Sequence, residues 1–394
     1  MPKKTIKDIE LRGKRVFTRV DFNVPRAQDG SISDDTKIRA ALPTISYLLQ
    51  HGAAVILASH LGRPKGQVQE NLRLRAVAER LEQLLGQKVI YVRAVTGPEV
   101  TQAAQELQPG RVLLLENVRF HPGETKNDPE LAKEYAALAD LFVSDAFGTA
   151  HRAHASNVGI AAYLPAVAGF LMEKEINNLS RTLHNPQKPV VAIVGGSKTA
   201  DKIGVLTNFL RLADTILLGG GMANTFLAAK SYQLGKSLVE KEQLQQAAAV
   251  MKAAEKHGVR LCLPVDVTVA FGLHEAAGAC NVNVDAVPAD MMVVDIGEET
   301  RKLFAAYIRG AGTVIWNGPL GVFETDAFAR GTIAVAQAVA ASAAFSIIGG
   351  GDVVAAVEKA GVANNISHLS TGGGATLEFW EGKELPGIAV IQDL

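Results

Sequence analysis

The stretch Val190-Val191-Ala192-Ile193-Val194-Gly195-Gly196 decides the fold, because an apolar run ending in glycines is typical of a buried strand in a parallel sheet. Further along the chain, apolar runs also precede the glycine clusters 219–221, 349–351 and 372–374. Glycine has no Cβ, so the chain can turn sharply and approach a ligand closely. Four clusters therefore predict backbone amides gathered around one ligand, and a nucleotide phosphate tail is the natural candidate.

In the first half of the chain, the strand-like runs end in basic side chains instead. These are Arg19, His60, Arg63, Arg119, His151 and Arg152. Arginine offers planar donors that match phosphate oxygens, and several arginines converging without neighbouring carboxylates require an anion. This half is therefore predicted to bind an acidic small molecule. A solvated basic loop is the alternative at each position, and the repetition of the pattern disfavours it.

Short Val/Ile/Leu runs alternate with helical patterns along the whole chain, which is the rhythm of βαβ units. The predicted strands are 15–20, 53–58, 111–116, 140–144, 190–194, 214–218, 259–263, 313–316 and 345–348, and the helices include 72–85, 129–139 and 240–257. A length of 394 residues suggests two domains. The predicted fold class is α/β, with two doubly wound, Rossmann-like parallel-sheet domains joined by a hinge helix. Ligands should collect beyond the carboxyl ends of the strands.

The domain boundary is predicted at a helix over residues 171–185. Its apolar residues step by four, three and four along one face: Met172, Ile176, Leu179 and Leu183. Asn185-Pro186 then ends it. A surface helix of one large domain is the alternative, and the length of the chain favours the connector.

Composition excludes several classes of partner. Lys plus Arg and Asp plus Glu are 40 each, so no bulk positive field exists for nucleic acid or an anionic membrane. Cys262 and Cys280 lack zinc-site spacing and are too sparse for a disulfide framework, which predicts a reducing cytoplasm. No apolar segment follows the basic N-terminus, so no secretory signal is expected. Residues 332–348 fall short of the ~20 strongly apolar residues of a membrane span and predict a buried crossover helix running into a strand.

The segment from Arg19 to Pro25 alternates polar and apolar residues. Period two places Arg19, Asp21 and Asn23 on one side of an extended chain, with Val20, Phe22 and Val24 toward the core. Asp21 and Asn23 could then hold hydroxyl and carboxylate groups of a substrate. An edge strand with a solvated face is an equally good alternative.

The segment from Gly195 to Lys202 superficially looks like a P-loop. It fails that pattern, because Ser197 stands where the glycine before the lysine is required. Lys198 and Lys202 are four residues apart, which at a helix start directs both ammonium groups toward one region. Two like charges are costly there unless a polyphosphate lies between them. A solvated helix N-terminus is the alternative.

Two further segments of the second half carry polar groups at strand ends. Asn317 and the turn after it could shape an adenine or ribose slot, Glu324 could accept ribose hydroxyls, and Trp316 is expected in the core. Asp352 follows three glycines and is suited to hold Mg²⁺ against nucleotide phosphates. It could also be the N-cap of a helix beginning at Val353, and both roles can coexist.

Taken together, these motifs resemble those of phosphoglycerate kinase. The resemblance runs through the whole chain in order, over residues 19–25, 59–64, 116–120, 145–148 with 151–152, 195–198, 219–222, 316–319 and 349–352. It implies reversible transfer of the acyl phosphoryl group of 1,3-bisphosphoglycerate to MgADP, giving 3-phosphoglycerate and MgATP in glycolysis. It also implies a monomer.

The resemblance assigns roles to individual residues. Phosphoglycerate would be bound by Asp21, Asn23, Lys37, His60, Arg63, Arg119 and Arg152. The nucleotide would be bound by Lys202, Gly220, Asn317, Pro319, Glu324, Gly350, Gly351, Asp352 and Val353, with magnesium on Asp352. The groups acting on the transferring phosphoryl group would be Lys37, Lys198, Lys202 and Gly373.

Two positions depart from the family pattern. Lys37 stands where the family usually has an arginine, and lysine keeps the charge but loses the bidentate fork. Val353 stands where threonine or serine is common, so only its backbone N–H can serve a phosphate.

The resemblance also implies that the chain returns to its first domain. Residues 1–170 with the tail 380–394 would bind phosphoglycerate, 171–185 would connect, and 186–379 would bind nucleotide. A carboxylate or phosphate oxygen is already nucleophilic, so alignment and charge neutralisation suffice without a catalytic base. Domain closure is expected about Glu175 and residues 368–371.

Two rival functions use similar folds. A nicotinamide-dependent dehydrogenase should show Gly-x-Gly-x-x-Gly after its first strand with an acidic residue about 20 positions on, and neither is present. A non-catalytic binding protein with two lobes would have no reason to combine Lys198, Lys202 and Asp352 with an arginine cluster.

Overall fold

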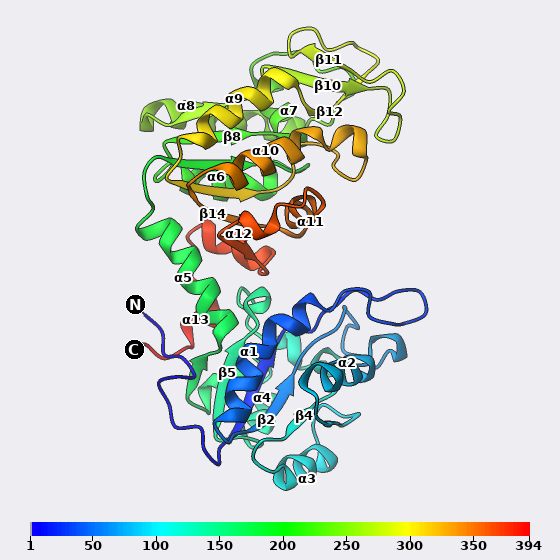
Figure 1. The fold of residues 1–394 in the computed structure, drawn as a ribbon, viewed down its shortest axis with the longest axis vertical. Helices are drawn as coiled ribbons and strands as arrows, with labels where there is room; N and C mark the ends of the chain where they lie inside the picture. The colour runs from blue at the N-terminus through cyan, green and yellow to red at the C-terminus, as the bar shows by residue number, and fades with distance from the viewer. Residues whose placement is uncertain (1) are drawn as a thin grey trace. The chain divides into compact units, whose positions relative to one another are not determined.

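The computed structural model describes residues 2–394 and contains two six-stranded sheets in which all neighbouring strands run parallel (Figure 1). The chain divides into two compact units. Unit 1 comprises the chain up to Asn177 together with Glu384–Leu394, and unit 2 comprises Asn178–Lys383. The predicted α/β class with two doubly wound sheets is confirmed.

The sheet of unit 1 has the strand order β3-β4-β2-β1-β5-β6. Its strands are β1 (Arg15–Val20), β2 (Ala54–Ala58), β3 (Val89–Tyr91), β4 (Val112–Leu114), β5 (Leu141–Asp145) and β6 (Ala166–Ala168). Its helices are α1 (Thr36–Gln50), α2 (Arg75–Leu85), α3 (Pro98–Glu106), α4 (Pro129–Ala136) and α13 (Pro386–Ala389). The predictions missed β3 and β6, which are only three residues long.

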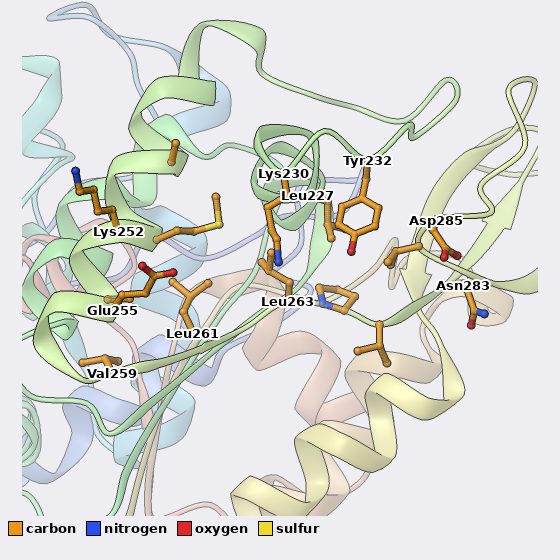
Figure 2. Close-up of a pocket in the computed structure, with 16 residues that line it drawn as sticks. Leu227, Lys230, Tyr232, Lys252, Glu255, Val259, Leu261, Leu263, Asn283 and Asp285 are labelled. Atoms are coloured by element: carbon orange, nitrogen blue, oxygen red, sulfur yellow. The ribbon is translucent and has the colours of Figure 1, made fainter.

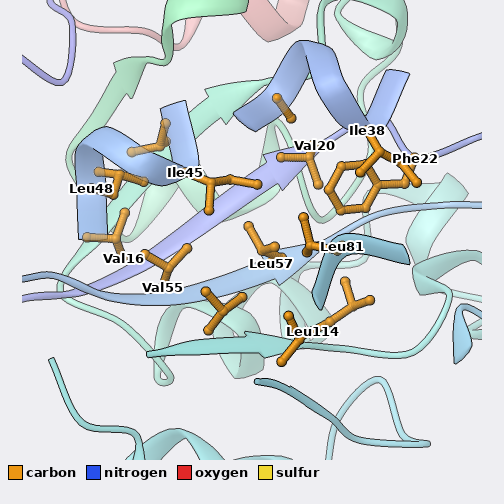
Figure 3. Packing of buried hydrophobic residues seen from close by; sticks show 14 of the residues in the cluster. Val16, Val20, Phe22, Ile38, Ile45, Leu48, Val55, Leu57, Leu81 and Leu114 are labelled. Carbon is orange, nitrogen blue, oxygen red and sulfur yellow. The ribbon is translucent and has the colours of Figure 1, made fainter. Parts of the chain in front are cut away.

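Alternate residues of each unit 1 strand face opposite layers of helices. On one face, Val16 and Leu57 pack against Ile45 of α1 and Leu81 of α2 (Figure 3). On the other face, Phe17 and its strand neighbours pack with residues of α3 and α4. Both faces are buried, which explains why the strands read as continuous apolar runs.

The sheet of unit 2 has the strand order β15-β14-β13-β7-β8-β9. Its strands are β7 (Val190–Val194), β8 (Thr215–Leu218), β9 (Arg260–Cys262), β13 (Thr313–Asn317), β14 (Phe345–Gly349) and β15 (His368–Ser370). Its helices are α6 (Ile203–Phe209), α7 (Gly220–Ala229), α8 (Leu244–His257), α9 (Glu298–Arg309), α10 (Arg330–Ala341), α11 (Gly351–Lys359) and α12 (Gly374–Trp380). The run 332–348 is the predicted crossover from α10 into β14.

One face of the unit 2 sheet packs against α9, α10 and α11. Trp316 is fully buried there with Phe304 and Val335, and its Nε1 donates to the Gly318 carbonyl at 2.8 Å. The prediction that Trp316 is a core residue is confirmed. Elsewhere in unit 2, α6 meets α12, where the rings of Phe209 and Trp380 lie 6.1 Å apart.

A third sheet was not predicted. It is three-stranded and antiparallel, with the order β11-β10-β12, and consists of β10 (Asp266–Ala270), β11 (Cys280–Asn283) and β12 (Met292–Ile296). Its apolar residues Val267 and Val269 pack against Leu227 of α7. β11 is largely exposed and polar, so it carries little of the hydrophobic signal on which the predictions relied.

The unit boundary falls within α5 (Phe170–His184), the helix predicted over 171–185. The two ends of the chain lie together in unit 1 (Figure 1). Lys4 N–H donates to Gln392 O at 2.8 Å, and Gln392 N–H donates to Ala166 O at 3.0 Å, beside β6. None of the helices in residues 2–394 is long and apolar enough to cross a bilayer.

Asp145 anchors the start of α5 in unit 1. Its Oδ1 accepts from the Leu171 and Met172 amides at 2.9 and 3.2 Å. Gly169 permits this contact, because a Cβ there would lie 2.3 Å from the same oxygen. The carboxyl group is fully buried, and burial raises the pKa of Asp145 to about 7. A strand end is thereby fixed to a helix start.

Asp145→Asn should make stability less dependent on pH. The pKa of Asp145 rises from 3.8 to about 7 in the fold, so folded protein retains a proton that unfolded protein has lost in this window. The free energy of unfolding therefore falls as pH rises through this window, by up to about 1.4 kcal/mol for each pH step of one. Asparagine keeps an acceptor oxygen but cannot ionise, so its unfolding temperature should fall less between pH 5 and 8.

Thermal unfolding followed by circular dichroism checks this expectation. Asp140→Asn is the matched control, because it removes an exposed carboxylate, whose Oδ2 accepts from the Arg15 amide at 2.8 Å, just before the same strand. Identical pH profiles for wild type and Asp145→Asn would contradict the assignment.

Candidate active site

The predicted site residues collect at the carboxyl edges of the two parallel sheets, at the points where strand order reverses. In unit 1 the reversal lies between β1 and β5, and in unit 2 between β7 and β13. Loops on opposite sides of such a point diverge and leave room for a ligand. Asp21 follows β1 and Arg152 follows β5, while Lys198 follows β7 and Pro319 follows β13.

In unit 1, Asp21 and Asn23 fix neighbouring parts of the edge. Asp21 Oδ2 accepts a hydrogen bond at 2.9 Å from Nζ of Lys37, which lies in the first turn of α1. Burial alone would raise the pKa of Asp21, but the charge of Lys37 and the hydrogen bonds from Lys37 and the Asn23 amide outweigh burial, so the pKa of Asp21 is lowered. Asn23 Oδ1 accepts from the Gly62 amide at 2.8 Å, which holds the loop after β2. Through its bond to Asp21, Lys37 therefore lies with the residues predicted to bind phosphoglycerate.

The apolar half of the predicted alternation is also confirmed. Val20, Phe22 and Val24 are buried in the unit 1 core. Arg19 is fully buried as well, which is unusual for arginine and calls for a full set of acceptors. Its guanidinium donates to Ser156 Oγ at 2.8 Å and to Val20 O at 2.5 Å.

The same guanidinium determines the state of His60. Arg19 Nη2 lies 3.2 Å from His60 Nδ1, and a guanidinium can only donate, so Nδ1 is the acceptor. Burial lowers the pKa of His60 well below its ordinary value, so the imidazole is neutral at pH 7. The proton therefore resides on Nε2, which makes His60 a neutral donor.

Arg119 and Arg152 complete the cationic part of the cluster. Arg119 Nη1 donates to Gly62 O at 2.8 Å, while its buried Nε has no hydrogen-bond partner within residues 2–394. Burial lowers the pKa of Arg119 to about 10, and the charges of Arg19 and Arg152 lower it further. Arg152 and Arg63 are exposed. Mutually destabilised cations with an unused donor are suited to an anionic ligand.

The prediction that these arginines converge without neighbouring carboxylates is wrong. Asp21 pairs with Lys37, and the buried Glu124 accepts from Ser156 Oγ at 2.6 Å and from Ser156 N at 3.1 Å. Ser156 thus joins Glu124 to Arg19. Sequence reasoning missed Glu124 and Ser156, because a polar residue in a loop gives no sign that it will be buried.

In unit 2, three loops cross at the point of reversal. Gly195 N–H donates to Asn317 O and Gly196 N–H to Pro319 O, both at 2.8 Å, and Gly220 N–H donates to Leu320 O at 2.9 Å. Gly220 has φ 65°, and a Cβ there would lie within 2.9 Å of atoms of both Gly196 and Pro319. The glycine clusters therefore allow the loops after β7, β8 and β13 to meet.

Lys202 and Asn317 connect these loops to β14. The Lys202 ammonium donates to Asn317 Oδ1, and Asn317 Nδ2 donates to Gly349 O at 2.6 Å. Burial lowers the pKa of Lys202 to about 8, although Asp201 and Asp352 oppose this effect. Within residues 2–394 no carboxylate forms an ion pair with Lys202, so the charge is poised for an incoming anion.

Lys198 is placed differently from the prediction. Both lysines were expected on one helix start, but Lys198 lies in an exposed bend, and Lys202 ends the short 3₁₀ helix Ala200–Lys202 before α6. The helical spacing argument is therefore wrong. Lys198 is exposed and lies just before the 3₁₀ helix that Lys202 ends.

A pocket of about 460 Å³ in unit 2 gathers several predicted nucleotide residues. Its lining includes Gly220, Pro319, Glu324 and Asp352, with Leu238 contributing to an apolar wall. Such a combination of an apolar wall and few polar groups is typical of ligand sites. Gly220 and Pro319 belong to the crossing loops, so the pocket opens beside them.

Asp352 and its neighbours begin α11. The helix starts at Gly351 with Gly350 as N-cap, and Asp352 makes no side-chain capping bond, so the alternative that Asp352 is the N-cap is wrong. Val353 is buried in the unit 2 core, where α11 packs against α10, which leaves only its backbone for a ligand. Gly373, with φ 52°, is the N-cap of α12 after β15.

The residues present fit a hydrated Mg²⁺ carried by a nucleotide. Asp352 is exposed, lines the pocket and has no hydrogen bond or ion pair to another of the described residues. No group of three or more acidic, His or Cys ligands exists in residues 2–394. Mg²⁺ is usually held by one or two carboxylates, water and substrate phosphates rather than by a protein cage.

A larger groove of about 860 Å³ lies elsewhere in unit 2, along α7, α8 and β9 (Figure 2). Its described lining includes Leu227, Lys252 and Leu261 and none of the predicted site residues. Volume alone therefore does not locate the site. The positions at the point of reversal and the half-buried ammonium of Lys202 are better guides.

Comparison with known proteins agrees with this geometry. The sequence model described as "Phosphoglycerate kinase" matches residues 6–383. The chain is 58% identical over 393 residues to a phosphoglycerate kinase of Moorella thermoacetica and 56% identical over 398 residues to one of Chloroflexus aggregans, with all of each chain covered. Among solved structures, phosphoglycerate kinase from Coxiella burnetii matches with a TM-score of 0.91 and 46% identity, covering 99% of this chain and 98% of that one.

A more distant relative shows the same fold. Phosphoglycerate kinase from Pyrococcus horikoshii matches with a TM-score of 0.86 and 36% identity, covering 98% of each chain. The sequence match and both structural matches extend over nearly the whole length, as the order of the motifs does. The chain belongs to the phosphoglycerate kinase family.

Proposed function

We propose that this chain performs the reaction of its family with the two groups of residues described above, one in each unit. It is a phosphotransferase with a carboxyl group as acceptor: 1,3-bisphosphoglycerate gives up its acyl phosphoryl group to MgADP, and 3-phosphoglycerate and MgATP are formed in glycolysis. The half-buried Lys202 ammonium, which is bonded to Asn317 and has no ion-pairing carboxylate within residues 2–394, carries the proposal.

The unit 1 cluster would hold phosphoglycerate. Arg63, Arg119 and Arg152 supply charge for its phosphate, and the free Nε of Arg119 is one donor available to it. His60 would donate from Nε2, while Asp21 and Asn23 would orient hydroxyl and carboxylate groups. Lys37 would neutralise charge on the transferring group. Hydrogen bonds within the cluster hold these groups in place before the ligand arrives.

The unit 2 pocket would hold the nucleotide. Glu324 would accept from the ribose, Asn317 and Pro319 would shape the slot, and the amides of Gly220, Gly350, Gly351 and Val353 would contact phosphates with Gly373 nearby. Asp352 would hold the magnesium of the nucleotide, which spreads the phosphate charge when bound. Lys198 and Lys202 would neutralise the charge of the phosphoryl group during transfer.

No proton relay is needed for this chemistry. The attacking oxygen of ADP or of the carboxylate is already ionised, so the protein aligns the reactants, excludes water and neutralises charge. With the ligands assigned to residues 1–170 with 380–394 and to 186–379, we propose that motion about 171–185 brings them together. Equal solution scattering profiles for the apo and doubly liganded protein would argue against it.

A cytoplasmic location and a monomeric state complete the proposal. Cys262 and Cys280 are both free thiols, as expected in a reducing compartment. Light scattering of the purified protein would measure the oligomeric state.

Lys202→Ala should lower kcat by ~10²–10³-fold, because a donor that neutralises transition-state charge is lost. A coupled assay for ATP formation measures the rate. Lys230→Ala removes an exposed lysine of the larger groove and should keep the wild-type rate. Full activity in a folded Lys202→Ala protein would remove Lys202 from the site.

ADP affinity of the wild-type protein should fall as pH rises above about 8, because the pKa of Lys202 lies there and the neutral amine no longer attracts phosphate. Below this pH the ammonium is charged and binding should be pH-independent as far as Lys202 is concerned. Titration calorimetry at pH 7 and 9 measures the change. Lys202→Arg stays charged over this range and should not show the decline.

Lys37→Ala should lower kcat by ~10²-fold, since one donor to the transferring group is removed. Lys37→Arg should retain or raise the rate, because arginine can still pair with Asp21 and adds a bidentate fork. Arg39→Ala is the control, since Arg39 pairs with Asp35 at 2.8 Å instead. A larger loss for Arg39→Ala than for Lys37→Ala would reassign the catalytic cation.

A further inference from the structure

Glu240 holds the loop that carries Lys198 and Lys202. Its Oε2 accepts from the Thr199 amide at 2.5 Å and from the Ala200 amide at 3.2 Å. Glu240 and these two residues are about forty positions apart in sequence, and no sequence motif at Glu240 predicts the contact. One carboxylate oxygen thus satisfies two successive amides between the two lysines.

These amides stand at a helix start that lacks a cap of its own. Thr199 precedes the 3₁₀ helix Ala200–Lys202 and makes no side-chain capping bond. The first amides of a helix have no partner within it, so another acceptor must be found. Thr199 is fully buried while Lys198 is exposed, so the loop turns from solvent to core at the point where Glu240 contacts it.

The segment before Glu240 reaches the nucleotide pocket. Leu238 lines that pocket and lies close to Gly221 of α7: a Cβ added to Gly221 would be only 3.2 Å from Leu238 Cδ2. Glu240 N–H donates to Thr225 Oγ1 of α7 at 3.1 Å, which fixes the segment between these two contacts. The short stretch 238–240 therefore connects the apolar wall of the pocket with the loop that carries Lys198 and Lys202.

We propose that Glu240 is a positioning residue for phosphoryl transfer, which fixes the 197–200 bend so that Lys198 is presented to the transferring group. This inference rests on the proposed function. Glu240 itself would not contact phosphate, because two anions repel. By occupying the Thr199 and Ala200 amides, it also keeps phosphates off this helix start and leaves them to the amides of α7 and α11.

The role needs an acceptor oxygen at the end of a side chain of this length. Glu240→Gln keeps that oxygen and removes the charge, whereas Glu240→Met keeps length and bulk but offers no good acceptor. Glu242→Ala is the matched control, because Glu242 is an exposed carboxylate two residues away that makes no hydrogen bond or ion pair within residues 2–394.

Steady-state kinetics of the full chain with 1,3-bisphosphoglycerate and MgADP test the proposal. Glu240→Met and Glu240→Ala should lose ~10–100-fold in kcat, the scale of a misplaced catalytic group, with a smaller change in KM for ADP. Glu240→Gln should recover most of the rate, and Glu242→Ala should match wild type. If Glu240→Ala fails to fold, Glu240→Met still decides the question, since it preserves packing.

A double-mutant cycle with Lys198→Ala separates this inference from the proposed function. If Glu240 acts through Lys198, then Glu240→Met should cost little in kcat once Lys198 is alanine. A Lys198→Ala protein with full activity would overturn the site assignment itself. A damaging Lys198→Ala combined with an additive or silent Glu240→Met would overturn only the positioning role, as would a Glu240→Gln protein as slow as Glu240→Met.

Discussion

The hydrogen bond between the Lys202 ammonium and Asn317 is the interaction on which the organisation of unit 2 depends. Asn317 ends β13 and also donates to Gly349 at the end of β14, so one side chain ties the lysine loop to two neighbouring strands. The bond leaves a cation half-buried without an ion-pairing carboxylate in the described chain, which burial makes costly. The fold tolerates this cost because three glycine-containing loops cross there and hold the backbone around it.

Much of this arrangement was predictable from local sequence. The central strands β1, β2, β7 and β13 were found because both faces of a parallel sheet are buried, which gives continuous apolar runs. The residues predicted for the site could be singled out because strand ends in such sheets point to one edge. The resemblance to a family then supplied the roles of individual side chains, which spacing alone left open.

What could not be predicted depends on contacts between distant segments. The β10–β12 sheet has an exposed, polar β11, and the strands β3, β6 and β15, which were also missed, are three-residue strands at sheet edges. The burial of Glu124 and the contact of Glu240 with Thr199 arise only when loops far apart in sequence meet. The mistaken helical placement of Lys198 has the same origin, since a distant carboxylate occupies the amides that a regular helix start would leave open.

The closure of unit 1 by Glu384–Leu394 has a consequence for biosynthesis. The ribosome synthesises Lys4 and Ala166 before unit 2, yet Gln392, which hydrogen-bonds to both residues, is synthesised only after unit 2. All of unit 2 is translated between these two events and has its own sheet and core. Unit 2 can therefore reach its native state on the nascent chain, whereas unit 1 stays incomplete until residues 384–394 have been synthesised as well.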